Sequence, residues 1–174
     1  MAEQKKAQGR KADGKKAAKT DAEGRLVVAT HRRARFEYEI LDTLEAGLQL
    51  VGPEVKSLRA GRANLGDAFA QVHRGELWLE KLHISPYEPA TRENPTDPQR
   101  RRKLLVHRHE IARLEGRVAE KGLTLVPVTL YFRHGRAKVE LALARGKQRH
   151  DKRETIRRRE HDRETQRVMR RHRR

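Results

Sequence analysis

The segment Glu45–Asn64 restricts the possible folds of this chain more than any other part of it. It begins in a stretch with strand periodicity, breaks at a Gly-Pro pair, and continues as a predicted helix over residues 53–60. Pro53 suits the first position of a helix, and Gly61 suits the position just past its end, where a left-handed backbone is usual. A helix this short cannot connect parallel strands, because such a crossover needs a dozen or more residues. It is typical of a corner piece in a closed antiparallel sheet.

The residues before this helix alternate between apolar and polar side chains, which is the period of a β-strand with one face in water. The apolar positions are Phe36, Tyr38, Ile40, Leu44, Ala46, Leu48 and Leu50. A straight strand of this length would span roughly 50 Å, which is too long for a small domain. We therefore expect the strand to bend at Ala46-Gly47, through a bulge or a corner, and to join two halves of a sheet.

Two hairpins are predicted after the short helix, each with a two-residue turn. Their arms are residues 65–73 and 76–84 around Arg74-Gly75, and residues 123–132 and 137–145 around His134-Gly135. In the arm formed by residues 123–132, alternate positions are apolar, so we expect these side chains to share one face. They are Val126, Val128, Leu130 and Phe132.

Two more helices are expected between the hairpins. Asp97-Pro98 combines an N-cap residue with a first-position proline, and residues 110–121 repeat apolar side chains at helical spacing until Gly122. With the bent strand counted twice, residues 34–150 hold about six strands and three short helices. This pattern predicts a mainly β protein, built as a small closed six-stranded β-barrel of the oligonucleotide-binding (OB) type.

Basic residues are concentrated at the two ends of the chain. The formal net charge is +18, and residues 1–33 and 151–174 hold two thirds of that excess. Such a balance favours a polyanionic partner, usually nucleic acid. An anionic membrane would require an amphipathic helix with an apolar face, which these segments lack. We expect residues 1–28 to be a disordered basic tail, residues 29–150 to form the barrel domain, and residues 151–174 to be disordered until they fold on a partner.

The sequence offers little to a catalytic or metal-dependent function. It has no cysteine, no phosphate-binding loop, no apolar run near the ~18 residues of a membrane span and no secretory signal. We therefore predict a cytoplasmic protein without metal or cofactor. His107 and His109 do not share a helical face, and the carboxylates of residues 37–45 lack a partner that would indicate acid–base chemistry, so a metal-dependent RNA-processing enzyme is the weakest hypothesis. With aromatic residues at 4%, recognition of folded RNA by backbone and shape is favoured over base stacking.

Five segments of this chain resemble the SmpB family (small protein B, the SsrA-binding protein). They occur in the family's order, from about residue 29 to residue 160, and read EAGLQLVGPEVKSLRAGRANL, HISPYE, DPQRRRKLLVHRHEI, EKGLTLVPVTLYF and KVELALARGKQRHDKRETIRRRE. The resemblance implies an OB-type barrel that binds transfer-messenger RNA (tmRNA, or SsrA RNA) and takes it to 70S ribosomes stalled on mRNA without a stop codon. It also implies a monomeric binding protein, not an enzyme, which mimics the anticodon arm of tRNA and meets alanyl-tmRNA together with elongation factor Tu.

The resemblance also implies where the RNA is bound. Glu45 matches an acidic residue of the family's RNA-binding surface, and Leu105 matches a leucine beside it. The Glu45 carboxylate could accept hydrogen bonds from bases or orient a neighbouring arginine; the alternatives are a solvated strand residue for Glu45 and a core residue for Leu105. His31 stands where many members have asparagine. The other residues that we predict on this surface are Arg33, Lys56, Arg62, Asn64, Arg102 and Lys103.

The resemblance further implies that the C-terminal tail enters the empty mRNA channel and contacts the decoding centre. His150 is the candidate for stacking on a base there. The remaining predicted tail contacts are Asp151, Lys152, Arg153, Arg157, Arg158, Val168, Met169 and Arg170. The alternative function is a ribosomal or ribosome-assembly protein with rRNA-binding tails, which would stay on all ribosomes through a high-salt wash.

Overall fold

A computed structural model describes residues 19–20, 24–87, 97–119 and 122–148, together with Ile156, Thr165 and Met169. The strands are β1 (Lys19–Thr20), β2 (Leu26–Thr30), β3 (Tyr38–Leu48), β4 (Ala63–Asn64), β5 (Phe69–His73), β6 (Glu76–Glu80), β7 (His83–Ile84), β8 (Arg102–Leu105), β9 (Leu123–Arg133) and β10 (Arg136–Gly146). The helices within the described ranges are α1 (Ala34–Glu37), α2 (Gly52–Arg59) and α4 (Arg108–Val118).

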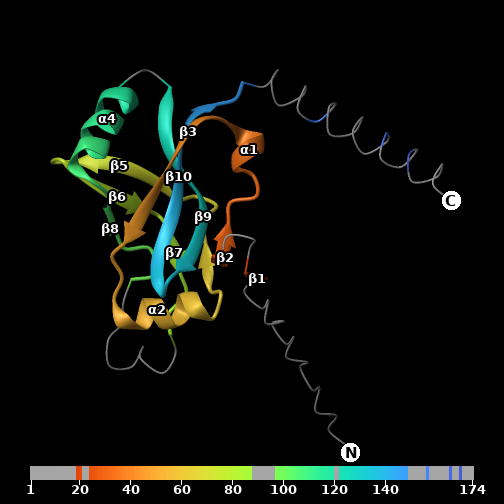
Figure 1. The fold of residues 1–174 in the computed structure, drawn as a ribbon, viewed down its shortest axis with the longest axis vertical. Coiled ribbons are helices and arrows are strands. Elements are labelled where there is room, and N and C mark those ends of the chain that lie inside the picture. Colours follow the sequence, from red (N-terminus) through yellow and green to blue (C-terminus); the bar gives the residue numbers. More distant parts are fainter. Residues whose placement is uncertain are drawn as a thin grey trace, which may run out of the picture.

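Six of the strands form a closed ring (Figure 1). Its order is β9-β10-β3-β8-β6-β5, and the pairing of Ala70 in β5 with Leu125 in β9 closes it. The strand pairs of the ring are antiparallel. β2 pairs with the later half of β9 and carries β1 on its other edge, while β4 and β7 form a separate pair. The prediction of a mainly β protein with six strands around one core is confirmed at this level.

The inside of the ring is a single apolar core. Every strand of the ring contributes buried residues, among them Ala46, Leu48, Ala70, Leu77, Leu79, Leu104, Leu125, Leu130, Val139, Leu141 and Leu143. Leu58 of α2 and Leu114 of α4 belong to the same core, and the two helices lie at opposite ends of the ring in Figure 1. The core is therefore closed at its ends by α2 and α4.

β3 alternates between buried and exposed residues as predicted, but its start and its bulge differ from the prediction. Residues 34–37 form α1, so the strand begins at Tyr38 and not at Phe36. The bulge is at Leu41, where the pairing with β10 slips, and not at Ala46-Gly47. Gly47 has another role: it pairs with both Lys138 of β10 and Leu105 of β8. A Cβ atom there would lie 3.2 Å from the Leu105 Cβ, so glycine permits the close approach of β8.

Both predicted two-residue turns are confirmed. Arg74 and Gly75 have φ angles of 53° and 72°, and His134 and Gly135 have φ angles of 49° and 74°. Positive φ at both central residues matches the twist of the flanking strands, so these turns join the hairpins β5–β6 and β9–β10 without splaying them. Gly61 also has the expected left-handed backbone, with φ of 71°, after α2.

The prediction that four alternate residues of β9 share one face is wrong. The pairing of β9 with β10 slips between Thr129 and Pro127, which leaves Val128 as an extra residue and reverses the parity on one side of it. Leu130 and Phe132 face the core, whereas Val126 packs outside it in a small cluster with Ala34 and Ala144.

Two other predicted boundaries need correction. No helix begins at Asp97-Pro98: Asp97 Oδ1 accepts a hydrogen bond from the Gln99 amide at 2.9 Å, and this turn leads straight into β8. β2 begins at Leu26, three residues before the predicted start of the domain at residue 29, because Leu26 packs on the core and pairs with Phe132 of β9. α4 is confirmed but ends at Val118.

A buried ion pair joins α2 to β8. The Arg102 side chain is fully buried and the Glu54 side chain is 4% exposed. Arg102 Nε donates to Glu54 Oε1 at 2.9 Å, and its other nitrogens donate to the carbonyls of Leu82 and Pro98. Glu54 also accepts hydrogen bonds from Arg100 and from the Val51 amide. The prediction that Arg102 lies on an RNA-binding surface is therefore wrong, because the β8 register turns it into the core.

Candidate RNA-binding surface

The strand register places one row of residues across the outer face of the sheet. From β8 to β2 it consists of Leu105, Gly47, Lys138, Tyr131 and Val27, each paired directly with the next. Directly paired residues project from the same face of a sheet. This face is the outer one, since the strand neighbours Leu104, Val139 and Leu130 are buried in the core.

Glu45 lies two residues before Gly47 and therefore shares this outer face. Its Oε1 accepts a hydrogen bond from Lys138 Nζ, and its Oε2 accepts one from the Tyr131 hydroxyl. Arg133 Nη1 lies 3.7 Å from the same Oε2. The four residues Glu45, Tyr131, Arg133 and Lys138, hereafter the Glu45 cluster, carry a net charge of +1, because the two cations outnumber the single carboxylate.

Contacts within the cluster shift the pKa values of two of its members. Hydrogen bonds from Lys138 and Tyr131 lower the pKa of Glu45, and they outweigh the opposite effect of its partial burial. Burial, followed by the hydrogen bond to Glu45, raises the pKa of Tyr131. At neutral pH the carboxylate is ionised and the phenol keeps its proton, so each is in the form that the hydrogen bond between them requires.

This arrangement favours one of the two roles predicted for Glu45. Both of its oxygens already accept hydrogen bonds from side chains of this chain, so it is suited to orient cations and not to read bases. Lys138 and Arg133 remain partly exposed, at 29% and 42%, and they are the groups that a phosphate could reach. Sequence reasoning missed both of them. The outward parity of Lys138 in the second hairpin was a usable signal, but its contact with Glu45 depends on the β3–β10 register.

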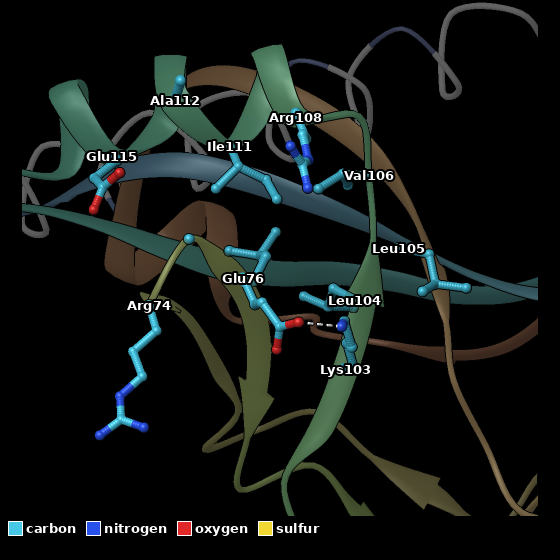
Figure 2. A pocket seen from close by; sticks show the side chains of 12 residues that line it. Arg74, Glu76, Lys103, Leu104, Leu105, Val106, Arg108, Ile111, Ala112 and Glu115 are labelled. Carbon is cyan, nitrogen blue, oxygen red and sulfur yellow. Dashed lines mark hydrogen bonds and ion pairs between the residues drawn. The ribbon is translucent and has the colours of Figure 1, made fainter.

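Leu105 is 54% exposed on β8, so the alternative that it is a core residue is wrong. Lys103, two residues earlier on the same strand, also faces outward and forms an ion pair with Glu76. It lines an open groove between α4, the β5–β6 turn and β8 (Figure 2). In that view Leu105 lies at the end of the groove farthest from Glu115.

The other predicted surface residues lie elsewhere. His31 is only 8% exposed, since it follows β2 directly and its amide donates to the Val128 carbonyl, so its contact with RNA stays a prediction. Arg33 is exposed beside α1 and pairs with Glu37. Lys56 of α2 lies over the Tyr87 ring, and Arg62 and Asn64 are exposed near the end of α2. Glu45 and Leu105 therefore lie on the same outer face of the neighbouring strands β3 and β8. That face does not include His31, Arg33, Lys56, Arg62 or Asn64.

Most of the predicted tail contacts fall outside the described residues. These are His150, Asp151, Lys152, Arg153, Arg157, Arg158, Val168 and Arg170. Met169 is described; it is helical and 65% exposed. The predictions for the tail therefore stay predictions.

A family model described as "SmpB protein" matches residues 28–171. The chain belongs to the SmpB family. This confirms the resemblance read from the five sequence segments. The match begins inside β2, so β1 and the first residues of β2 precede the part that the SmpB family model covers.

Individual members of the SmpB family are similar over nearly their whole length. The SsrA-binding protein of Desulforudis audaxviator is 59% identical over 143 residues, which cover 82% of this chain and 93% of that protein. The SsrA-binding protein of Synechococcus elongatus is 54% identical over 87% of this chain and 98% of its own length. A solved chain described as "tmRNA-SmpB: a journey to the center of the bacterial ribosome" has a TM-score of 0.61 and 53% identity, and covers 74% of this chain and 94% of itself.

None of the helices in the described part of the chain is long and apolar enough to cross a membrane. No group of three or more histidine or acidic side chains within the described ranges could hold a metal ion.

Proposed function

We propose that this chain binds tmRNA (SsrA RNA) and acts with the ribosome in trans-translation, by binding and not by catalysis. The observation that carries this proposal is the match to the SmpB family over residues 28–171. It is supported by relatives named SsrA-binding proteins and by a similar solved chain described together with tmRNA and the bacterial ribosome.

The finer parts of the proposal concern how the protein works. The six-stranded ring is an OB-type barrel that stands in for the anticodon arm of tRNA when the protein takes tmRNA to a stalled ribosome. The basic tail of residues 151–174 then enters the empty mRNA channel at the decoding centre. The protein acts as a cytoplasmic monomer and meets elongation factor Tu through alanyl-tmRNA.

The Glu45 cluster suggests how the RNA is held. Lys138 and Arg133 are cations on a sheet surface, where they can approach the phosphates of folded RNA. Glu45 fixes their positions, so the entropy of ordering two long side chains is already lost before the RNA binds. Exposed Leu105, at the end of the same row, offers an apolar contact to a sugar or a base edge.

The test is the replacement of Glu45 by arginine. This change makes the protein more basic, and attraction by charge alone would strengthen RNA binding. We expect the opposite, because the new cation repels Lys138 and Arg133 and removes the acceptor that orders them. The loss of a hydrogen bond to a charged group predicts a roughly 10- to 100-fold weaker affinity for tmRNA, measured by fluorescence anisotropy at constant salt.

Glu39→Arg is the matched control. Glu39 is exposed on the same strand, and its replacement changes the charge by the same amount without touching the Glu45 cluster. We expect this variant to bind tmRNA as tightly as the unmodified chain or more tightly. Equal affinities for the two variants would show that the cluster is not part of the RNA-binding surface.

A further inference from the structure

One residue of the Glu45 region comes from the segment that precedes the family match. Arg25 lies just before β2, outside residues 28–171. Its guanidinium carbon is 5.0 Å from the centroid of the Tyr131 ring, a distance typical of a cation–π contact. Tyr131 projects from the outer face of β9, and yet it is only 1% exposed. Arg25 is therefore part of the cover over this ring.

The backbone holds Arg25 firmly in this place. Leu26 and Val27, the next two residues, pair with Phe132 and Tyr131 of β9. On the other edge of β2, the short strand β1 pairs with the same two residues. Arg25 is thus tied to β9 immediately beside the ring that it covers, and its contact with Tyr131 follows from the strand register.

The contact has a consequence for Glu45. The Tyr131 hydroxyl leaves its acceptor when the ring rotates about its side-chain torsions, and the groups that cover the ring oppose this rotation. A guanidinium stacked on the ring restricts this rotation. The restricted ring keeps its hydroxyl on Glu45 Oε2, and the same carboxylate binds Lys138 and lies near Arg133.

We propose that Arg25 is a positioning residue of the RNA-binding surface, which holds Tyr131 against Glu45 and so orders Lys138 and Arg133. This rests on the proposed RNA-binding role of the Glu45 cluster. The segment before the family match is then a structural part of that surface as well as a basic extension. The RNA meets cations that are already ordered, which lowers the entropic cost of binding.

The first experiment compares two full-length variants, Arg25→Met and Arg101→Met. Arg101 is the matched control because its guanidinium also lies over an aromatic ring, that of Trp78 at 5.7 Å. In addition, Arg101 pairs with Glu80. Both variants lose one positive charge and one cation–π contact. We expect Arg25→Met to weaken the affinity for in vitro transcribed tmRNA roughly three- to tenfold more than Arg101→Met does.

The second experiment repeats the comparison in chains that carry Tyr131→Phe. Without the hydroxyl, there is no hydrogen bond for Arg25 to maintain. We expect the extra loss caused by Arg25→Met to disappear in this background, so the effects of the two substitutions are not additive. Equal losses in both backgrounds would overturn the proposal, because Arg25 would then act on the RNA independently of Tyr131.

The third measurement uses the free protein, so it does not depend on any RNA. Carbon-detected NMR follows the titration of the Glu45 carboxyl group. We expect its pKa to rise in Arg25→Met, toward the value in Tyr131→Phe, and to stay unchanged in Arg101→Met. An unchanged Glu45 titration in Arg25→Met overturns the positioning role. A shifted titration, combined with normal tmRNA affinity of Glu45→Arg, would instead refute the RNA-binding role of the cluster.

Discussion

Replacing Glu54 with glutamine is expected to lower the free energy of unfolding by about 3–5 kcal/mol, the usual cost of removing one partner from a buried ion pair. The reason is that Arg102 has no access to water and keeps its charge. Its hydrogen bonds to the Leu82 and Pro98 carbonyls remain, but neither of them neutralises that charge. Urea denaturation followed by circular dichroism at neutral pH measures the change.

Two further variants show whether burial is the cause. Glu80→Gln weakens the pair with Arg101, whose side chain is 50% exposed, and should change stability by less than about 1 kcal/mol. The double variant Glu54→Leu with Arg102→Met removes both charges and should be more stable than Glu54→Gln, because it leaves no unpaired buried ion. A Glu54→Gln variant as stable as Glu80→Gln would show that the buried pair contributes little.

The same residue predicts a dependence of stability on pH. Burial raises the pKa of Glu54, but the hydrogen bonds from Arg100 and Val51 and the charges of Arg102 and Arg100 together bring it below its ordinary value. A carboxyl group with a lowered pKa in the folded state stabilises the fold above its unfolded pKa, about 4.3, and this contribution is lost as the pH falls through the folded pKa. The stability difference between the unmodified chain and Glu54→Gln should therefore shrink below about pH 4, in urea titrations repeated from pH 7 downward.

Ending the chain after Arg149 is expected to abolish peptide tagging on stalled ribosomes while leaving the affinity for tmRNA nearly intact. The ring is complete before this point, because β10 ends at Gly146 and the Lys147 amide donates to the Glu37 carbonyl at 2.9 Å. The Glu45 cluster lies wholly within the part that is kept. Tagging is measured in a reconstituted translation reaction on mRNA without a stop codon, and affinity is measured with the same RNA.

The matched control keeps residues 150–174 in scrambled order, with the same length and net charge. If the tail reads the ribosome through particular residues, such as His150, the scrambled chain should also fail to tag. If the scrambled chain tags normally, the tail acts through its net charge and not through particular residues. Loss of tmRNA binding on truncation would contradict the proposed division between ring and tail.

The local elements of this fold were predictable because their signals are local. Pro53 and Gly61 delimit α2, and the turns Arg74-Gly75 and His134-Gly135 define the two hairpins. The bulges at Leu41 and Val128 were not predictable, because a bulge is a mismatch between two strands far apart in the sequence. The failed helix at Asp97-Pro98 has a similar cause: the capping signal was correct, but the pairing of the next residues with β6 required a strand.

The same distinction applies to the site. The sequence of the basic run before Leu104 does not show which of its side chains are buried. The register of β8 decides this, because it turns Arg102 inward and Lys103 outward. Glu45 was found through the family resemblance, and its alternating strand placed it on the wet face. Its partners Lys138 and Tyr131 lie about 90 residues further along the chain and reach it only through tertiary pairing.

The position of β10 has a consequence for the synthesis of this protein. β10 is the last strand of the ring in the chain order, and yet it lies between β3 and β9 in the sheet. A nascent chain therefore cannot close its ring until β10 has left the ribosome, and it cannot complete the Glu45 cluster until Lys138 has done so. Copies that stop before β10 leave the residues of β3 and β9 that pair with it without their partners, and copies that stop before Lys138 lack a member of the Glu45 cluster. We therefore expect copies that stop before Lys138 to bind the RNA more weakly than the finished protein does.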